Sequence, residues 1–257
     1  MPTKELAQYM KNAKRIVAFT GAGISTGSGI PDFRGPQGLW KQWRPIYYNE
    51  FMSSEEARIL HWKFKLAGWK QFLQAKPNPA HLALSKLDIA NRLEIVITQN
   101  IDGLHQMAGL SEEKVIELHG TNRAVECQSC KKLSDPEPVF QQFESSGQSP
   151  TCLCGGFLKP ATISFGQQMP TDKLAQAFET AAQSDLIITI GSTLEVEPAA
   201  SIPLKAKEKG ARYIIINQGP TAQDHLADLR LEGDATILLP EAVQHLFQLL
   251  KNDQKAF

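Results

Sequence analysis

The fold is decided by the stretch GAGISTGSGIPDFRG, residues 21–35, which directly follows the apolar run RIVAFT at residues 15–20. Such a run is typical of a buried strand, so the glycines should lie at the strand's carboxyl end, where open α/β sheets bind ligands. Glycines allow a tight turn there and let backbone N–H groups approach a phosphate. The spacing of Gly21, Gly23 and Gly27 is one residue longer than the dinucleotide fingerprint, so these glycines alone fit an ordinary strand-to-helix turn equally well.

The residues that follow the glycines favour ligand binding over a plain turn. Arg34 is a suitable partner for a phosphate, and Phe33 could cover a flat ring. Asp32 can accept hydrogen bonds from a ribose or order the loop, while Pro31 stiffens the turn.

Apolar runs and helical stretches alternate along the chain. The runs predict strands at residues 15–20, 94–98, 115–118, 186–190, 213–217 and 235–239. The stretches between them predict helices at residues 4–12, 79–88, 171–183, 198–209 and 241–251. Continuous rather than alternating apolar strands indicate a parallel sheet covered on both faces. The sequence therefore predicts an α/β fold with a doubly wound, Rossmann-like parallel sheet.

Two stretches interrupt this alternation and predict a smaller domain that is inserted into the sheet domain. Residues 38–75 contain all four tryptophans and look helical from Ser53 onward, and residues 121–160 contain all four cysteines. We therefore expect a helical insertion at 38–75 and a zinc-binding insertion at 121–160. The Rossmann-like domain would comprise residues 1–37, 76–120 and 161–257.

Polar residues follow the other predicted strands as well. Each has an ordinary interpretation, because Asn and Asp are common in turns and a lone His is more often structural than catalytic. A single crevice for a large polar cofactor explains them together. The polar residues that follow the strands are Gln99, Asn100 and Asp102, then His119, then Ser192 and Thr193, then Asn217 and Gln218.

The four cysteines indicate a metal site. Cys127 and Cys130 form a C-x-x-C pair, whereas Cys152 and Cys154 form C-x-C, whose side chains would point apart in an extended chain. Two glycines directly after the second pair could let the chain turn. Four thiolates suit one tetrahedral zinc ion, and a closed four-sulfur site would be structural. The alternative, four reduced buried cysteines, suits this polar insertion less well.

Composition excludes some classes of partner and compartment. Lys and Arg number 27, as do Asp and Glu, so the net charge of zero argues against non-specific binding to nucleic acid or anionic membrane. The apolar runs are far shorter than the ~20 residues of a membrane helix, and the first 15 residues lack the apolar region of a secretory signal. We expect a cytoplasmic protein.

Several blocks together resemble the signature sequences of the sirtuins, the NAD-dependent protein deacylases. They occur in family order over roughly residues 15–240 and include GAGISTGSGIPDFRG, TQNIDGLH, ELHG, the cysteine pairs, SFG, GSTLEVEP and INQGPT. The stretches ARILHWKFKLAGW, PNPAHLALSKL and INQGPTAQDHLADLRLEGDA are further similar to the class II, mitochondrial-type branch and its bacterial relatives. The resemblance implies acyl-lysine proteins or peptides as substrates, with NAD consumed.

The resemblance also assigns roles to residues. His119 would be the general base, with Asn100 and Asp102 in the nicotinamide pocket as the other catalytic residues. The NAD-binding set would be Gly21, Ala22, Gly23, Ser25, Asp32, Phe33, Arg34, Gln99, Asn100, Ile101, Asp102, Gly191, Ser192, Thr193, Asn217, Gln218, Gly219, Asp234 and Ala235. The substrate would lie as an extended strand between two segments, Ser164, Phe165 and Gly166 on one side and Glu195, Val196 and Glu197 on the other. We expect His61, His81, His105, His225 and His245 to be structural or surface residues.

The sequence leaves open which acyl group the enzyme prefers, and it allows two alternatives to the deacylase function. The Tyr-x-x-Arg pair that marks sirtuins selective for acidic acyl chains is not evident in LHWKF, while the tryptophan-rich insertion suggests a roomy apolar channel for lipoyl or fatty acyl groups. A protein ADP-ribosyltransferase or NAD hydrolase on the same fold is one alternative, although neither needs an acyl relay through His119. A non-enzymatic sensor of NAD or acyl-lysine is the other, and the intact set of Asn100, Asp102 and His119 argues against it.

Overall fold

The fold is organised around a six-stranded parallel sheet with the strand order β3-β2-β1-β7-β8-β9. The computed structural model of the chain describes residues 1–35 and 38–255. The strands of this sheet are β1 (Ile16–Thr20), β2 (Leu93–Thr98), β3 (Val115–Glu117), β7 (Leu186–Ile190), β8 (Arg212–Asn217) and β9 (Leu229–Glu232). Every residue of the central strands β1 and β7 is buried, as the continuous apolar runs predict.

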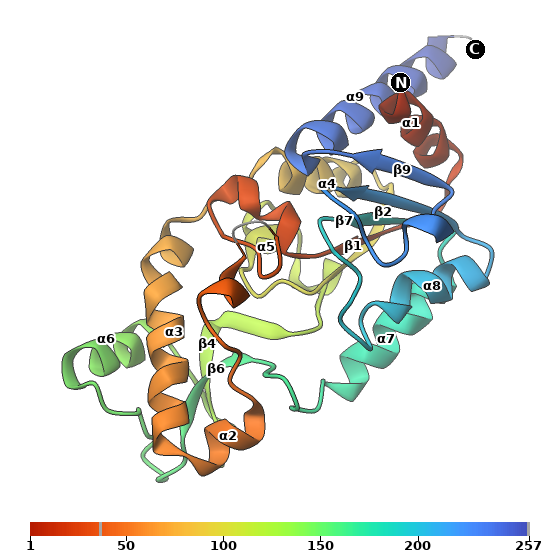
Figure 1. The fold of residues 1–257 in the computed structure, drawn as a ribbon. Coiled ribbons are helices and arrows are strands. Elements are labelled where there is room, and N and C mark those ends of the chain that lie inside the picture. Colours follow the sequence, from red (N-terminus) through yellow and green to blue (C-terminus); the bar gives the residue numbers. More distant parts are fainter. Residues whose placement is uncertain (36–37, 256–257) are drawn as a thin grey trace.

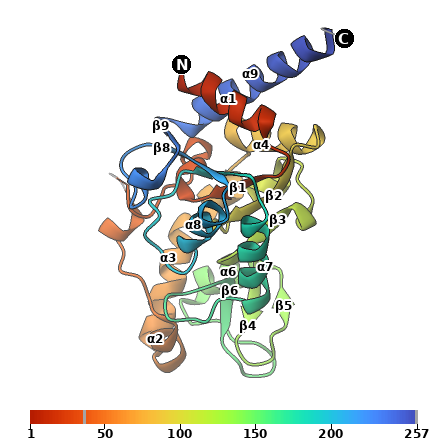
Figure 2. The same cartoon turned by 90° about the vertical axis from the view of Figure 1, so that its right-hand side faces the viewer.

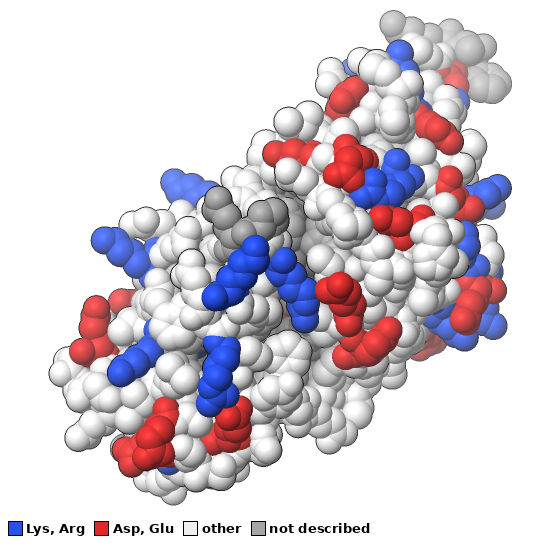
Figure 3. Space-filling model, in the orientation of Figure 1, with Lys and Arg blue, Asp and Glu red and all other residues white. Residues whose placement is uncertain are grey.

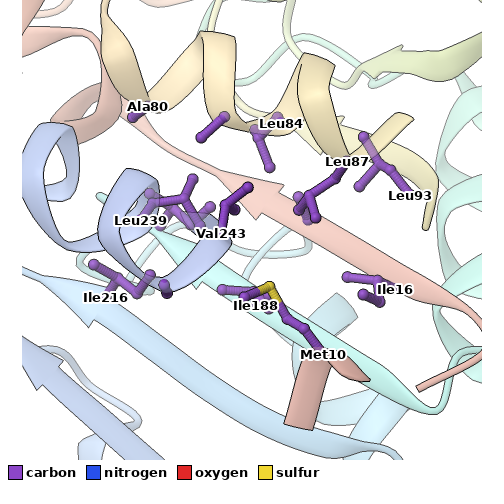
Figure 4. Packing of buried hydrophobic residues seen from close by; sticks show 14 of the residues in the cluster. Met10, Ile16, Ala80, Leu84, Leu87, Leu93, Ile188, Ile216, Leu239 and Val243 are labelled. Carbon is purple, nitrogen blue, oxygen red and sulfur yellow. The ribbon is translucent and has the colours of Figure 1, made fainter. Parts of the chain in front are cut away.

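Helices cover both faces of the sheet (Figures 1 and 2). One face packs against α1 (Pro2–Asn12), α4 (Pro79–Ile89) and α9 (Ala235–Lys255), and the other against α7 (Thr171–Ala182) and α8 (Ser201–Glu208). Figure 4 shows the first layer, where Leu84 of α4 and Val243 of α9 lie above Ile188 of the sheet. The doubly wound α/β fold is therefore confirmed. Among the described helices, none combines the length and apolar character needed to cross a membrane.

The strand order reverses between β1 and β7, and this reversal positions the site. The chain runs outward from β1 through β2 to β3 on one side, and from β7 through β8 to β9 on the other. The connections that leave the carboxyl ends of β1 and β7 therefore diverge. A crevice at such a point is where doubly wound sheets bind ligands.

The two stretches that interrupt the alternation pack against each other. The second stretch forms most of a three-stranded antiparallel sheet, with β4 (Gly120–Cys127) between β5 (Leu133–Ser134) and β6 (Leu158–Thr162), together with helix α6 (Pro136–Ser146). The first forms α2 (Tyr48–Ser53) and the long α3 (Glu55–Gln74), and a short α5 (Leu104–Met107) follows β2. Trp62 and Trp69 of α3 pack against Phe140 and Phe143 of α6 and form a separate apolar core, in which Trp69 stacks on Phe140 and Trp62 meets it edge-on.

One predicted strand is wrong. Residues 235–239 begin α9, and the last strand of the sheet lies earlier, at Leu229–Glu232. The side chain of Asp234 accepts a hydrogen bond from the backbone N–H of Thr236 at 2.8 Å, as a helix N-cap does. Leu239 is buried while Ile237 is exposed, so the run ATILL presents one helical face rather than a buried strand. Short apolar runs fit either structure.

We predict that the packing of α3 on α6 contributes strongly to stability. Trp62 is fully buried, and its indole N–H donates to the Leu158 carbonyl at 3.2 Å. Replacing it with Ala removes the ring and leaves a cavity, so the free energy of unfolding in urea should fall by about 3–5 kcal/mol. Leu73→Ala on the same helix removes a side chain that is 55% exposed and should change the value by less than about 0.5 kcal/mol. Equal effects of the two substitutions would contradict this prediction.

Candidate functional site

A large cavity lies between the carboxyl edge of the parallel sheet and the smaller part of the molecule. Its volume is about 1110 Å³, and Figure 3 shows the hollow on this face, with basic and acidic side chains at its rim. Every residue of the predicted NAD-binding set lines it, from Gly21 to Ala235. Of the predicted substrate residues, Ser164, Phe165, Gly166, Val196 and Glu197 line it, and Glu195 does not.

The glycine turn after β1 packs against the turn after β7. The N–H of Gly23 donates to the Gly191 carbonyl at 2.8 Å, and the N–H of Gly21 donates to the Ile190 carbonyl at 3.0 Å. A Cβ at Gly21 would lie 2.6 Å from the Gly191 oxygen, and one at Gly23 would lie 2.8 Å from the Gly191 Cα. Gly191 itself has a φ of +65°, which favours glycine. These glycines therefore bring two strand ends into direct contact at the cavity wall.

Ser25, Asn100 and Asp102 form a buried hydrogen-bonded cluster on that wall. The Ser25 hydroxyl donates to Asp102 Oδ2 at 2.8 Å, and Asn100 Nδ2 donates to Ser25 Oγ and to the Gly21 carbonyl, each at 3.1 Å. Burial raises the pKa of Asp102, while hydrogen bonds from Leu104 N–H and Ser25 oppose the shift. The cluster offers an amide and a carboxyl group in fixed positions, which suits recognition of another amide.

Two histidines lie behind this cluster, where burial keeps them neutral. Burial lowers the pKa of His81 to about 4 and that of His105 well below its usual value. His81 Nε2 is 3.5 Å from Ser25 Oγ, and His105 Nε2 is 2.9 Å from Thr20 Oγ1. His81 therefore contacts the cluster directly, and the His105 ring lies against His81, with ring centroids 4.9 Å apart.

His119 lies at the cavity wall directly after β3, with one ring nitrogen fixed. Its Nδ1 lies 3.0 Å from the Gln99 carbonyl oxygen, which can only accept, so Nδ1 carries the proton. The neutral ring then has an unprotonated Nε2, which can accept a proton. Burial lowers the pKa of His119, and the bond to Gln99 partly opposes this shift. Gln99 is held in turn by donation from its Nε2 to Ser192 Oγ at 2.9 Å.

Arg34 contacts a carboxylate in this structure. Its Nε lies 3.4 Å from Glu195 Oε2, so the loop after the glycine turn meets the segment after β7 through an ion pair. Glu195 also accepts from the Thr193 hydroxyl at 3.3 Å. To bind a phosphate of a ligand, Arg34 would have to leave the Glu195 carboxylate.

Sequence reasoning expected apolar surface from the tryptophan-rich insertion but assigned no role to the individual residues that the loop after the glycines and α3 contribute to the cavity. Trp40, Trp43 and Phe64 form an aromatic wall, with ring centroids 5.5–5.7 Å apart where Phe64 meets each tryptophan. His61 and Lys65 line the cavity one helical turn apart, although His61 was expected among structural or surface residues. The concentration of tryptophan in residues 38–75 was the available signal for the aromatic wall. Nothing in the sequence marked the two polar residues.

The four cysteines converge as the metal prediction requires. Their sulfur atoms all lie within 4.8 Å of one another, with 3.5 Å between Cys127 and Cys154 and 3.8 Å between Cys130 and Cys152. Tetrahedral coordination with Zn–S bonds of about 2.3 Å places sulfurs about 3.8 Å apart, so the set fits zinc. The C-x-C pair meets this geometry because a tight turn, closed by donation from Gly155 N–H to the Cys152 carbonyl at 2.8 Å, brings both thiols to one side.

We predict one structural zinc ion per chain. Cys127→Ala should abolish zinc retention and lower the thermal unfolding temperature, because a structural zinc contributes folding free energy. Elemental analysis and thermal unfolding measure the two effects. Ser129→Ala, an exposed neighbour within the same knuckle, should retain zinc and stability. Folded, active wild-type protein without zinc would contradict the prediction.

Comparisons with known proteins agree with this geometry. The Sir2 family matches residues 21–198. The NAD-dependent protein deacetylase of Rhodopseudomonas palustris is 45% identical over 90% of this chain and 92% of its own. A Sir2 structure with a deacetylated p53 peptide and 3'-O-acetyl ADP-ribose has a TM-score of 0.89 at 38% identity, covering 95% of this chain and 98% of that one. Sir2Af2 bound to a myristoylated histone peptide has a TM-score of 0.80 at 32% identity, covering 98% of both. These matches confirm the resemblance to the sirtuins seen in the sequence, and the chain belongs to the Sir2 family.

Proposed function

We propose that the protein is an NAD-dependent protein-lysine deacylase that releases nicotinamide and O-acyl-ADP-ribose. The observation that carries the proposal is the fixed His119 ring, whose free Nε2 belongs to the same cavity as the cluster of Ser25, Asn100 and Asp102. The names of the relatives support it, since they are NAD-dependent protein deacetylases and deacylases. Cysteines arranged for zinc rather than for disulfides suit a reducing compartment, and we propose that the protein is cytoplasmic.

The cavity suits NAD and a substrate together. Its volume of about 1110 Å³ lies just above the usual range for ligand pockets, about 300–1,000 Å³. The turn at Gly21–Gly23 would face the pyrophosphate, and the loop carrying Phe33 and Arg34 would close over the nicotinamide end. The adenosine half would lie against the segments after β7 and β8 and the first residues of α9, namely Ser192, Thr193, Asn217, Gln218, Asp234 and Ala235.

Each polar residue then has a distinct task. Bound NAD supplies a ribose that loses nicotinamide and accepts the acyl group. Asn100 and Asp102 hold the nicotinamide carboxamide through the buried cluster, which fixes the orientation of the leaving group. His119 accepts the proton of a ribose hydroxyl at Nε2, while Nδ1 stays bonded to Gln99. The substrate backbone lies between the segment of Phe165 and that of Val196.

A variant pair tests the assignment of His119. His119→Ala should lower acyl transfer by roughly 10²–10⁴-fold, the typical effect of losing a positioned general base, and should leave part of the nicotinamide exchange, which needs no base. Asn100→Ala should lower both rates, because it disturbs the pocket used in the first step. Deacylation and nicotinamide exchange are measured on the same acyl peptide. His225→Ala, an exposed histidine, is the control and should keep both rates.

The pH dependence is part of the same test. The neutral imidazole is the active form, so kcat/KM should fall as the pH decreases through the pKa of His119. Because burial lowers that pKa, the midpoint of the acid limb should lie below the ordinary value of about 6.5. A His119→Ala protein that deacylates at the wild-type rate would exclude His119 as the general base, whereas nicotinamide release by the wild type without any acyl peptide would favour an NAD hydrolase.

We further propose that the enzyme acts on acyl groups larger than acetyl, such as lipoyl or medium-chain fatty acyl, as the class II resemblance also suggests. The aromatic wall of Trp40, Trp43 and Phe64 supports this, because apolar surface in the cavity gains from burying methylene groups. The related structure with a myristoylated peptide also supports it.

A panel of acetyl-, octanoyl- and lipoyl-lysine peptides of one sequence tests the acyl proposal. We expect kcat/KM to be higher for the longer chains than for acetyl. Phe64→Ala should reduce this preference, because it removes part of the aromatic wall. Leu73→Ala, on the same helix but outside the cavity lining, should not change it. A clear preference for acetyl over every longer chain would overturn the proposal.

A further inference from the structure

An arginine outside the cavity lining contacts the strand that carries the proposed general base. Arg123 belongs to β4, and its guanidinium forms two ion pairs. Its Nη2 lies 3.3 Å from Glu117 Oε1, and its Nη1 lies 3.2 Å from Glu112 Oε1. Glu117 is the last residue of β3 and precedes His119 by two positions. Arg123 is therefore bonded to the segment that places His119 at the cavity wall.

The same side chain packs against the turn that follows Asp102. A Cβ at Gly103 would lie 2.5 Å from Arg123 Cδ, so the arginine stem rests directly on this glycine. Gly103 has a φ of +70° and precedes α5, whose first N–H, that of Leu104, donates to Asp102 Oδ1 at 2.9 Å. The segments that hold Asp102 and His119 therefore meet at Arg123.

The two ion pairs of Arg123 differ in burial. The Glu117 side chain is 9% exposed, whereas that of Glu112 is 70% exposed. Within residues 1–35 and 38–255, no other cation lies within ion-pair distance of Glu117. Burial raises the pKa of Glu117, and the charges of Arg123 and Lys173 oppose this shift. A buried carboxylate that loses its partner is costly, while an exposed pair contributes little. The pair with Glu117 is thus the one that holds Arg123 in place.

We infer that Arg123 is a positioning residue for the nicotinamide pocket, because its bond to Glu117 fixes the turn at Gly103 and thereby the Asp102 carboxylate. The Ser25 hydroxyl donates to this carboxylate at 2.8 Å, and a shift of the turn would break that bond. Misplacing a binding group by 1 Å can lower a rate by about 10²-fold. The inference rests on the proposed function, since it takes Asp102 as a residue that binds nicotinamide.

Inhibition by free nicotinamide tests this inference, because a released product binds back to the pocket that it leaves. Arg123→Met removes both ion pairs and keeps an unbranched side chain. It should raise the nicotinamide inhibition constant and lower the rate of nicotinamide exchange, each by about 5- to 20-fold, the range expected when a buried charged group loses its partner. The KM for the acyl peptide should stay near the wild-type value, because Arg123 lies outside the lining of the cavity.

Three further variants separate positioning from general stability. Arg123→Lys keeps a cation that can donate to Glu117 and should restore most of the nicotinamide affinity. Glu112→Gln removes only the charge of the exposed pair and should leave the inhibition constant unchanged. Glu117→Gln should raise the constant less than Arg123→Met does, because an amide oxygen still accepts a hydrogen bond. The double variant of Arg123→Met and Glu117→Gln should be no worse than Arg123→Met, as expected for two residues that act as one unit.

The outcomes distinguish this inference from the proposed function. If wild type deacylates and Arg123→Met keeps the wild-type inhibition constant, or raises it no more than the peptide KM, the inference is overturned and the deacylase stands. If Arg123→Met does not fold, a wild-type inhibition constant in Glu117→Gln overturns the inference instead. If no acyl peptide stimulates nicotinamide release by the wild type, the proposed function fails. A raised constant in Arg123→Met that Arg123→Lys restores and Glu112→Gln does not share would establish the role of Arg123.

Discussion

The contact between the turns after β1 and β7 is the constraint on which the rest of the site depends. Gly23 donates to the Gly191 carbonyl at 2.8 Å, and no side chain fits between the two backbones. This contact joins the two halves of the sheet at the point where the strand order reverses. Ser25 and Ser192 therefore lie on adjoining walls of one cavity, although 166 residues separate them in the sequence.

Hydrogen bonds among side chains then convert this crevice into a site with fixed chemistry. Ser192 holds Gln99, and the carbonyl of Gln99 fixes the tautomer of His119. On the neighbouring wall, Ser25 joins Asn100 to Asp102. Each group is oriented before any ligand enters, which lowers the cost of reorganisation during a reaction. Burial lowers the pKa of His119, so the base form predominates at neutral pH.

The cavity wall that the smaller part of the molecule forms is stabilised in a different way from the wall that the parallel sheet forms. The smaller part has an apolar core of stacked aromatic rings and a cluster of four cysteines, rather than a large sheet with two covered faces. Helix α3 contributes to this core and to the cavity. Its Trp62 and Trp69 pack against α6, whereas Phe64 and Lys65 line the cavity. A helix with two such neighbours lines the cavity and also holds the smaller part together.

The sequence by itself determined the parallel sheet, the strand ends that supply the site and the metal cluster. These features are local, because continuous apolar runs mark buried strands and the polar residues follow each run directly, as at Asn100 and His119. The NAD-binding set was predicted through the family resemblance, and all of it lines the cavity. The tryptophans of residues 38–75 also indicated apolar surface beside the cavity, and Trp40 and Trp43 are among the residues that line it.

The tertiary structure alone decided the rest. The run at 235–239 became a helix because Asp234 caps it and only one of its faces is buried, which five residues cannot reveal. The C-x-C pair fits zinc because a turn brings its thiols together. Lys65 and His61 face the cavity because α3 packs between two surfaces and has no single apolar face. Such a helix lacks the periodic pattern from which sequence predicts burial, so only the packing shows where its polar side chains point.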